Sequence, residues 1–109
     1  MTFFSCPYLG DDVELTDERE HHITLRHPDL LPMYQQCIPD TLLLPDRVTR
    51  SSRIRHARLF SRWFGWLRGG KYVVVVVVSD LTSTERHWVV TAYMTNRLAR
   101  GGDIEWERI

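Results

Sequence analysis

The sequence predicts one α+β domain, with two helices in its N-terminal part followed by four strands. Helix-start signals and helical apolar spacing occur before residue 40, and β-branched and aromatic runs separated by glycines occur after it. A chain of 109 residues supplies one hydrophobic core but not two. With 43% apolar and 26% charged residues, the composition is that of a folded globule rather than a disordered chain.

The first expected helix begins after Thr16 and runs to about His27. The Thr16 hydroxyl can cap the first turn, and the acids that follow it suit the positive end of the helix dipole. Pro28 disfavours helical geometry in the residue before it, so the helix ends there. The acidic segment 1–15 before this helix is expected to be accessory or poorly ordered.

A second helix is expected over residues 28–38, because proline is tolerated in the first turn of a helix. Leu31, Tyr34 and Ile38 recur at the spacing of one helical face. Pro39 is expected to end this helix, so the chain changes from helix to strand near residue 40.

Four strands are expected in the second half of the chain. The first contains Pro45 and is therefore placed at a sheet edge. The third is a run of valines with no polar face, as in a strand that is covered on both sides. A polar connection precedes the fourth. The strands are Leu42–Leu44 with Val48, His56–Phe64, Lys71–Ser79 and Arg86–Met94, and the connection is Asp80–Glu85.

Side chains alternate between the two faces of a strand. In the fourth strand we expect a core face of Trp88, Val90, Ala92 and Met94 and an outward face of His87, Val89, Thr91 and Tyr93. In the second strand, one side holds His56, Arg58, Phe60, Arg62 and Phe64. If this side is also outward, arginines that bind phosphate alternate with rings that stack on bases. If Phe60 and Phe64 belong to the core, that assignment is reversed.

Charge is sorted along a chain that is neutral overall. Residues 47–71 carry eight positive charges and no carboxylate, whereas residues 1–46 carry nine acids and two arginines. Thirteen of the fourteen basic residues are arginine, whose planar set of donors fits phosphate oxygens. The basic segment predicts a phosphate track for RNA or DNA, or a solvated strand edge that pairs with the acidic N-terminal part.

Other classes of site and protein are disfavoured. The valine run is far shorter than the roughly 20 residues that cross a bilayer, and no secretory signal is visible, so a cytoplasmic protein without a membrane partner is expected. Cys6 and Cys37 are then expected to be free thiols. The five histidines lack zinc-site spacing, and no metal or cofactor is expected.

Three stretches, taken in order, resemble a known family. His22–Asp29 reads HITLRHPD, Ile38–Val48 reads IPDTLLLPDRV, and the pair Val73–Val78 and Val89–Tyr93 reads VVVVVV and VVTAY. Together they resemble the segments "HI..RHPE", "I..P..V" and "VVV…IVTAY" of the phage-type nuclease domains grouped with barnase, EndoU, the tRNA-cleaving colicins and RelE. Asp29 stands where glutamate is common. The tail of the family is matched by Arg97, Gly101 and Trp106.

This resemblance implies two N-terminal helices packed on a four-stranded antiparallel sheet. It also implies a metal-independent endoribonuclease, often a toxin, that cleaves tRNA or mRNA by attack of the 2′-hydroxyl and leaves 2′,3′-cyclic phosphate ends. The implied partners are the RNA substrate and an inhibitory antitoxin or immunity protein. The junction histidine of the family maps to His27, or else to His22. Its strand arginine maps to Arg58 or a neighbour, and its Thr-x-Tyr maps to Thr91 and Tyr93.

These residue types suit metal-free cleavage of RNA. Histidine titrates near neutral pH and can act as base or acid, and arginine stabilises the charge that develops on the phosphate. The threonine and tyrosine hydroxyls can position the phosphate. The expected catalytic residues are therefore His27, Arg58, Thr91 and Tyr93. The expected substrate contacts are His22, Arg26, Arg62 and Arg97.

Each of these residues also has a structural explanation. His27 can cap its helix, Arg26 can lie on a solvated helix face, and Thr91 and Tyr93 are good strand formers. Arg58 and Arg62 can be solvated. The alternative function is a non-catalytic module that binds nucleic acid or a protein through the same basic face. Two further aromatics, Trp88 and Trp106, are expected in the core.

Overall fold

The structure is a computed structural model that describes residues 1–82 and 84–109. Within these residues the chain forms seven strands and two helices, and the strands make one mixed sheet in the order β1-β2-β6-β5-β4-β3-β7. Neighbouring strands are antiparallel, except that β2 runs parallel to β6. The elements are β1 (Thr2–Cys6), β2 (Asp11–Leu15), α1 (Asp17–Arg26), α2 (Cys37–Leu43), β3 (Arg47–Arg50), β4 (Ala57–Phe64), β5 (Lys71–Asp80), β6 (Arg86–Thr95) and β7 (Asp103–Glu107).

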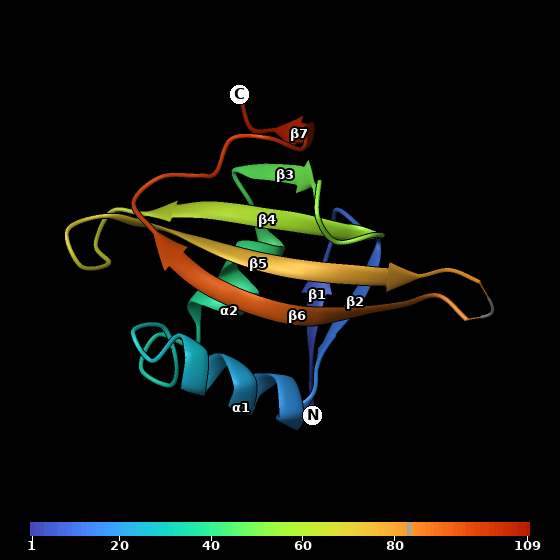
Figure 1. Ribbon diagram of the computed structural model, residues 1–109, viewed down its shortest axis with the longest axis horizontal. Coiled ribbons are helices and arrows are strands. Elements are labelled where there is room, and N and C mark those ends of the chain that lie inside the picture. Colours follow the sequence, from blue (N-terminus) through green and yellow to red (C-terminus); the bar gives the residue numbers. More distant parts are fainter. Residues whose placement is uncertain (83) are drawn as a thin grey trace.

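The expected four-stranded antiparallel sheet under two N-terminal helices is therefore wrong. An N-terminal hairpin, β1–β2, joins the sheet by pairing with β6 and crosses behind the central strands, and β7 extends the sheet beside β3 (Figure 1). The hairpin turns through Gly10, whose φ of 68° is a left-handed conformation that glycine adopts without strain. Segment 1–15 is thus part of the sheet: β2 pairs with β6, and the turn of the hairpin reaches β7, where Tyr8 contacts Glu105 and Trp106.

The first helix is as expected. The Thr16 hydroxyl accepts a hydrogen bond from the backbone N–H of Arg19 at 3.1 Å, and His27 ends the helix by donating its backbone N–H to Ile23. The expected second helix over residues 28–36 is wrong, because this segment forms turns. Pro39 lies inside α2 rather than after it.

A helix can contain Pro39 here because the proline lies in the first turn of α2, where backbone N–H groups have no partner within the helix. Leu42 and Leu43 belong to the same helix, so the strand expected at Leu42–Leu44 is also wrong. A short apolar run is compatible with either a helix or a strand, and here packing on the sheet decides. The first basic strand, β3, begins only at Arg47. The expected connection Asp80–Glu85 includes Ser83, which lies outside the described residues.

The two faces of the central strands differ in what covers them (Figure 1). On the helix-covered face, buried side chains of α1 and α2 pack on those of the sheet, and Phe60 is the largest side chain that is fully buried. The opposite side, called the open face here, has a smaller apolar cluster around Val74 and Val76. The open face carries Leu59, Ser61, Trp63, Tyr72, Val74, Val76, Thr91 and Tyr93.

One extra residue in β6 breaks the simple alternation of its side chains. Val77 of β5 pairs with Val89, but Val76 pairs with Thr91, so Val90 is a β-bulge between them. Simple alternation therefore assigns the side chains that precede the bulge to the wrong face of the sheet. The assignments of Thr91, Ala92, Tyr93 and Met94 are right, and those of His87, Trp88, Val89 and Val90 are reversed.

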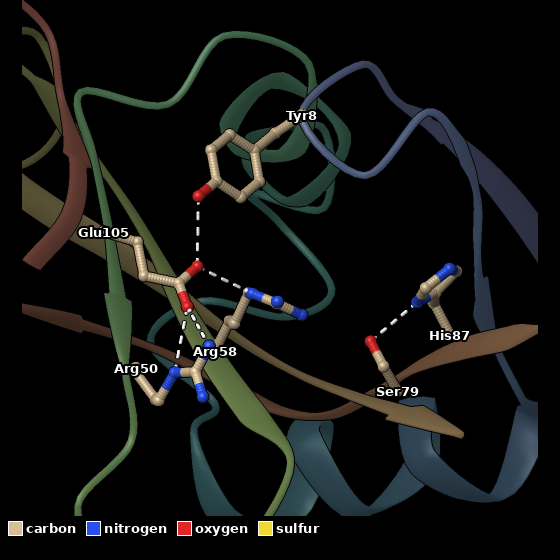
Figure 2. Close-up of polar contacts among 6 residues, drawn as sticks. All are labelled: Tyr8, Arg50, Arg58, Ser79, His87 and Glu105. Carbon is tan, nitrogen blue, oxygen red and sulfur yellow. Dashed lines mark hydrogen bonds and ion pairs between the residues drawn. The ribbon is translucent and has the colours of Figure 1, made fainter. Parts of the chain in front are cut away.

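Glu105 of β7 joins three parts of the chain that are far apart in sequence (Figure 2). Its carboxylate accepts hydrogen bonds from Arg58 Nε at 2.8 Å, from two nitrogens of Arg50 and from the Tyr8 hydroxyl at 3.0 Å. These donors come from β4, β3 and the turn of the N-terminal hairpin. Because the Glu105 side chain is only 15% exposed, this ion-pair network is shielded from solvent and stabilises the edge of the sheet.

Three smaller expectations are also resolved. Cys6 and Cys37 are free thiols, as expected, and burial raises the pKa of both. Trp106 is 39% exposed and Trp88 is partly exposed, so the expectation that both lie in the core is wrong. Neither helix of the described residues has the length and apolar character needed to cross a membrane.

We predict that Glu105→Gln lowers the free energy of unfolding at pH 7 by about 2 kcal/mol, the range for hydrogen bonds to a charged group. Burial is the largest influence on the pKa of Glu105 and raises it, but the bonds from Arg58, Arg50 and Tyr8 together hold it below the usual 4.5. A carboxylate with a lowered pKa in the folded state contributes stability above its unfolded pKa and loses it as pH falls.

The difference between native protein and Glu105→Gln should therefore shrink as pH falls below about 4.5, measured by urea unfolding at pH 7 and pH 3. Glu107→Gln is the matched control, because the Arg47–Glu107 pair on the same strands is half-exposed and worth at most about 1 kcal/mol. Equal stability losses in the two variants at pH 7 would contradict the assignment.

Candidate functional site

His27 and Tyr93 lie together at the free end of strand β6. Among the described residues, the hairpin pairs with β6 at Glu14 and Trp88 alone, so no described strand lies beside the later part of β6 on that side. Helix α1 lies along β6 instead, and its last residues reach the strand end (Figure 1). The ring centroids of His27 and Tyr93 are 5.8 Å apart. Two of the expected catalytic residues, 66 positions apart in sequence, are thus neighbours.

The Tyr93 phenol is partly buried, and its burial favours the protonated form. Burial raises its pKa above the usual 10.0, and the nearby charge of Arg53 offsets only part of that rise. The phenol is therefore protonated at neutral pH and can donate a hydrogen bond or a proton. Thr91 precedes Tyr93 by two positions, so the two side chains are successive residues on the open face of β6.

His22 and Arg26 accompany His27 on the last turns of α1. Desolvation lowers the pKa of His22 below the usual 6.5, and the charges of Arg19, Arg26 and His27 lower it further. His22 is accordingly neutral near pH 7. Arg26 is exposed, and within the described part of the chain its guanidinium has no ion-pair partner.

A basic cavity of about 230 Å³ opens beside Tyr93 on the open face. Arg53 and Arg100 line it from two loops, and neither has a side-chain hydrogen bond or ion pair to another described residue. We call it the basic hollow. Its other lining residues are Arg47, Thr49, Arg50, Ser51, Ser52, Leu59, Ser61, Val74, Tyr93, Leu98, Ala99, Gly101 and Gly102. Two free guanidinium groups among several hydroxyls are suited to bind a phosphate.

Gly102 has a structural role at the rim of this hollow. Its φ is 74°, and a Cβ at this position would come within 2.5 Å of the backbone oxygen of Arg50. Only glycine therefore allows the loop before β7 to approach the end of β3 this closely. The loop that carries Arg100 is held against the sheet by that contact.

Arg58 and Arg62 are not brought to this site. Arg58 shares its side of β4 with the buried Phe60, on the helix-covered face, and its charge is neutralised by Glu105 (Figure 2). Arg62 donates to the backbone oxygen of Asp40 at 3.1 Å on the same side. In β4, Phe60 and Phe64 lie in the core, so the side that carries Arg58 and Arg62 is the covered side and not the outward one. The expected role of Arg58 as a phosphate clamp beside Thr91 and Tyr93 has no support in this arrangement.

Arg97 is exposed just after β6, where its backbone exchanges hydrogen bonds with the Thr95 hydroxyl. A larger cavity of about 860 Å³ adjoins the basic hollow at Arg50 and Ser51 and extends to Trp88 of β6. Two of its three arginines, Arg50 and Arg58, are already paired with Glu105, and Asp80 adds a negative charge. Arg55 is then its one arginine without an ion pair among the described residues, against two in the basic hollow, so it is less suited to an anion.

One group of side chains has the composition of a metal site, which the histidine spacing in the sequence did not indicate. His87 Nε2 is 3.1 Å from Glu85 Oε1 and 3.7 Å from Asp11 Oδ2. The Ser79 hydroxyl lies 2.6 Å from Nδ1 of the same ring (Figure 2). Both ring nitrogens of this buried histidine therefore have hydrogen-bond partners within the protein. These contacts join β2, β5 and β6, which is a sufficient structural role for the group.

Two residues of the site, Arg53 and Arg100, were not among the sequence candidates. Arg53 belongs to the basic segment, but eight positive charges at similar spacing do not distinguish the free ones from those that acids neutralise. Arg100 lies in the tail and reaches the hollow only because the segment before β7 crosses to the far edge of the sheet. Neither fact can be obtained from local sequence pattern.

The site therefore combines an imidazole, a protonated phenol, two free arginines and several hydroxyls. No protein-family model, no curated protein and no solved structure matches this chain.

Proposed function

We propose that this protein is a metal-independent endoribonuclease whose site is the basic hollow and the adjoining His27–Tyr93 pair. The observation that carries the proposal is the contact of these two rings, 5.8 Å between centroids, beside a cavity that Arg53 and Arg100 line. The three functions that metal-free RNA cleavage needs are a proton acceptor, a proton donor and a cation for the phosphate. Each has a candidate within this one region.

In this mechanism a phosphodiester binds in the basic hollow through Arg53 and Arg100. The imidazole of His27 removes the proton from the 2′-hydroxyl, and the 2′-oxygen forms a bond to phosphorus. The bond from phosphorus to the 5′-oxygen breaks as Tyr93 donates its phenolic proton to that oxygen. The products are a 2′,3′-cyclic phosphate and a 5′-hydroxyl, and proton exchange with water then restores both side chains. The family that the sequence resembles is held inactive by antitoxins or immunity proteins. We therefore also propose that a protein inhibitor binds over this face.

A second candidate is a non-catalytic module that binds RNA through the same hollow. It is favoured by the number of arginine and hydroxyl donors, which is sufficient for binding without any acid or base. The two candidates differ in their product and not in their salt dependence, so cleavage has to be measured separately from affinity.

We predict that His27→Ala lowers the rate of RNA cleavage by at least about 100-fold, because a positioned acid or base contributes about 10²–10⁴-fold. The assay follows 2′,3′-cyclic phosphate ends on labelled RNA in excess chelator. His21→Ala is the matched control, since His21 is an exposed histidine of the same helix, and it should cleave like the native protein. Native protein that binds RNA and forms no product identifies the binding module instead.

We predict that Arg53→Ala and Arg100→Ala each weaken RNA binding and reduce its salt dependence. Each lost phosphate contact on a single strand should lower the slope of log K against log salt by about 0.7. Arg68→Ala is the control, because its guanidinium lies over the Tyr34 ring, 5.7 Å from the centroid, and does not line the basic hollow. An unchanged slope in both hollow variants would place the phosphate elsewhere.

A further inference from the structure

Next to the basic hollow, the open face presents a pair of aromatic side chains that the proposed chemistry does not use. Trp63 of β4 and Tyr72 of β5 are cross-strand partners, with ring centroids 4.9 Å apart in an edge-to-face arrangement. Trp63 is 45% exposed, so a large part of its apolar ring is in contact with solvent. An exposed aromatic beside free arginines is typical of a surface that binds an unpaired base.

The indole of Trp63 is held in place from below by the backbone. Gly70 has a φ of 103°, and a Cβ at this position would lie 2.5 Å from Cζ2 of Trp63. The ring therefore rests directly on the glycine, in space that any other residue would fill. The backbone N–H of Trp63 donates to Asp46 Oδ2 at 2.7 Å, which fixes the strand at the same point. A ring that is already fixed loses little conformational entropy when a ligand stacks on it.

Trp63 lies one step along the sheet from the hollow. Ser61, Val74 and Tyr93 form a row of cross-strand neighbours that lines the hollow, and Trp63 and Tyr72 belong to the next row on the same face. Rows two residues apart are separated by about 7 Å. A nucleotide whose phosphate occupies the hollow can therefore extend its base, or that of its neighbour, onto the indole.

We propose that Trp63 is a stacking platform for an unpaired base of the bound RNA, so that the substrate is single-stranded where it enters the site. This inference rests on the proposed function, because it assumes that the basic hollow holds RNA phosphate. A duplex keeps its bases stacked on one another and cannot place one on the indole without unpairing it. The platform thus makes the site select single strands or loops over helices.

The test is fluorescence anisotropy with a labelled single-stranded RNA that carries 2′-O-methyl groups, which prevent attack by the 2′-oxygen. Trp63→Ala should weaken binding by about 5- to 150-fold, the range for losing one stacked base. Trp63→Phe keeps an aromatic surface and should recover part of that affinity. The slope of affinity against salt should stay as in native protein, because no phosphate contact is removed.

Trp66→Ala is the matched control. Trp66 is 67% exposed, more than Trp63, but it packs on Tyr34 and Phe64 on the helix-covered side. Its loss should leave RNA affinity unchanged. A duplex of the same sequence should bind native protein more weakly than the single strand, and Trp63→Ala should reduce this preference.

The platform is ruled out if Trp63→Ala binds RNA as tightly as native protein does. It is also ruled out if native protein binds duplex and single-stranded RNA equally well. Cleavage of unmodified RNA by native protein separates this outcome from failure of the proposed function. If cleavage persists while Trp63→Ala binds normally, the platform alone is wrong. If native protein neither binds nor cleaves RNA, both the platform and the proposed function fail.

Discussion

The register between β5 and β6 controls which side chains reach the site. The extra residue at Val90 reverses the faces of everything before it in β6, because a shift of one residue moves a side chain to the opposite face. His87 is thereby placed among buried partners, while Thr91 and Tyr93 stay on the open face. Without the bulge, a strand that keeps His87 buried would turn Tyr93 into the core and away from the basic hollow. Valine suits this position, because its branched side chain fits the apolar cluster of the open face.

The second determinant of the site is the distribution of acids. Although the chain has as many acids as bases, several of its ion pairs lie at one edge of the sheet, where Glu105 and Glu107 of β7 pair with three arginines of β3 and β4. Arg53 and Arg100 extend from loops beyond the reach of those carboxylates and keep their charge for a ligand. The neutral total charge therefore conceals a local positive field.

The sequence predicted the central strands and the first helix well, because their signals are local: a capping threonine, a run of valines and glycines at the turns. It failed for residues 28–43, where a short apolar run suits helix and strand equally and only packing on the sheet decides. The strands β1, β2 and β7 have five residues each, and none has the long β-branched run that marks β5. Their pairing with β6 and β3 depends on residues far away in the chain, which local pattern does not show.

For the site, the pairing of His27 with Tyr93 followed from the family resemblance, and the structure brings the two rings together. Arg58 was assigned without knowledge of its partner, Glu105, which lies 47 residues further along the chain. Arg58 lies on the same face of β4 as Phe60 and Phe64. The pattern of this one strand does not show whether that face is the core or the solvent side. Long-range pairing of charges is the information that local pattern lacks.

The most direct test is the location of bound RNA, measured by the change in amide chemical shifts when isotope-labelled protein is titrated with a 2′-O-methyl single-stranded RNA. If RNA binds in the basic hollow, the largest changes occur at Arg53, Ser61, Tyr93 and Arg100. Changes centred on Tyr8, Arg58 and Glu105, or on the outer surface of α2, would show that the RNA binds elsewhere and would contradict the proposed site.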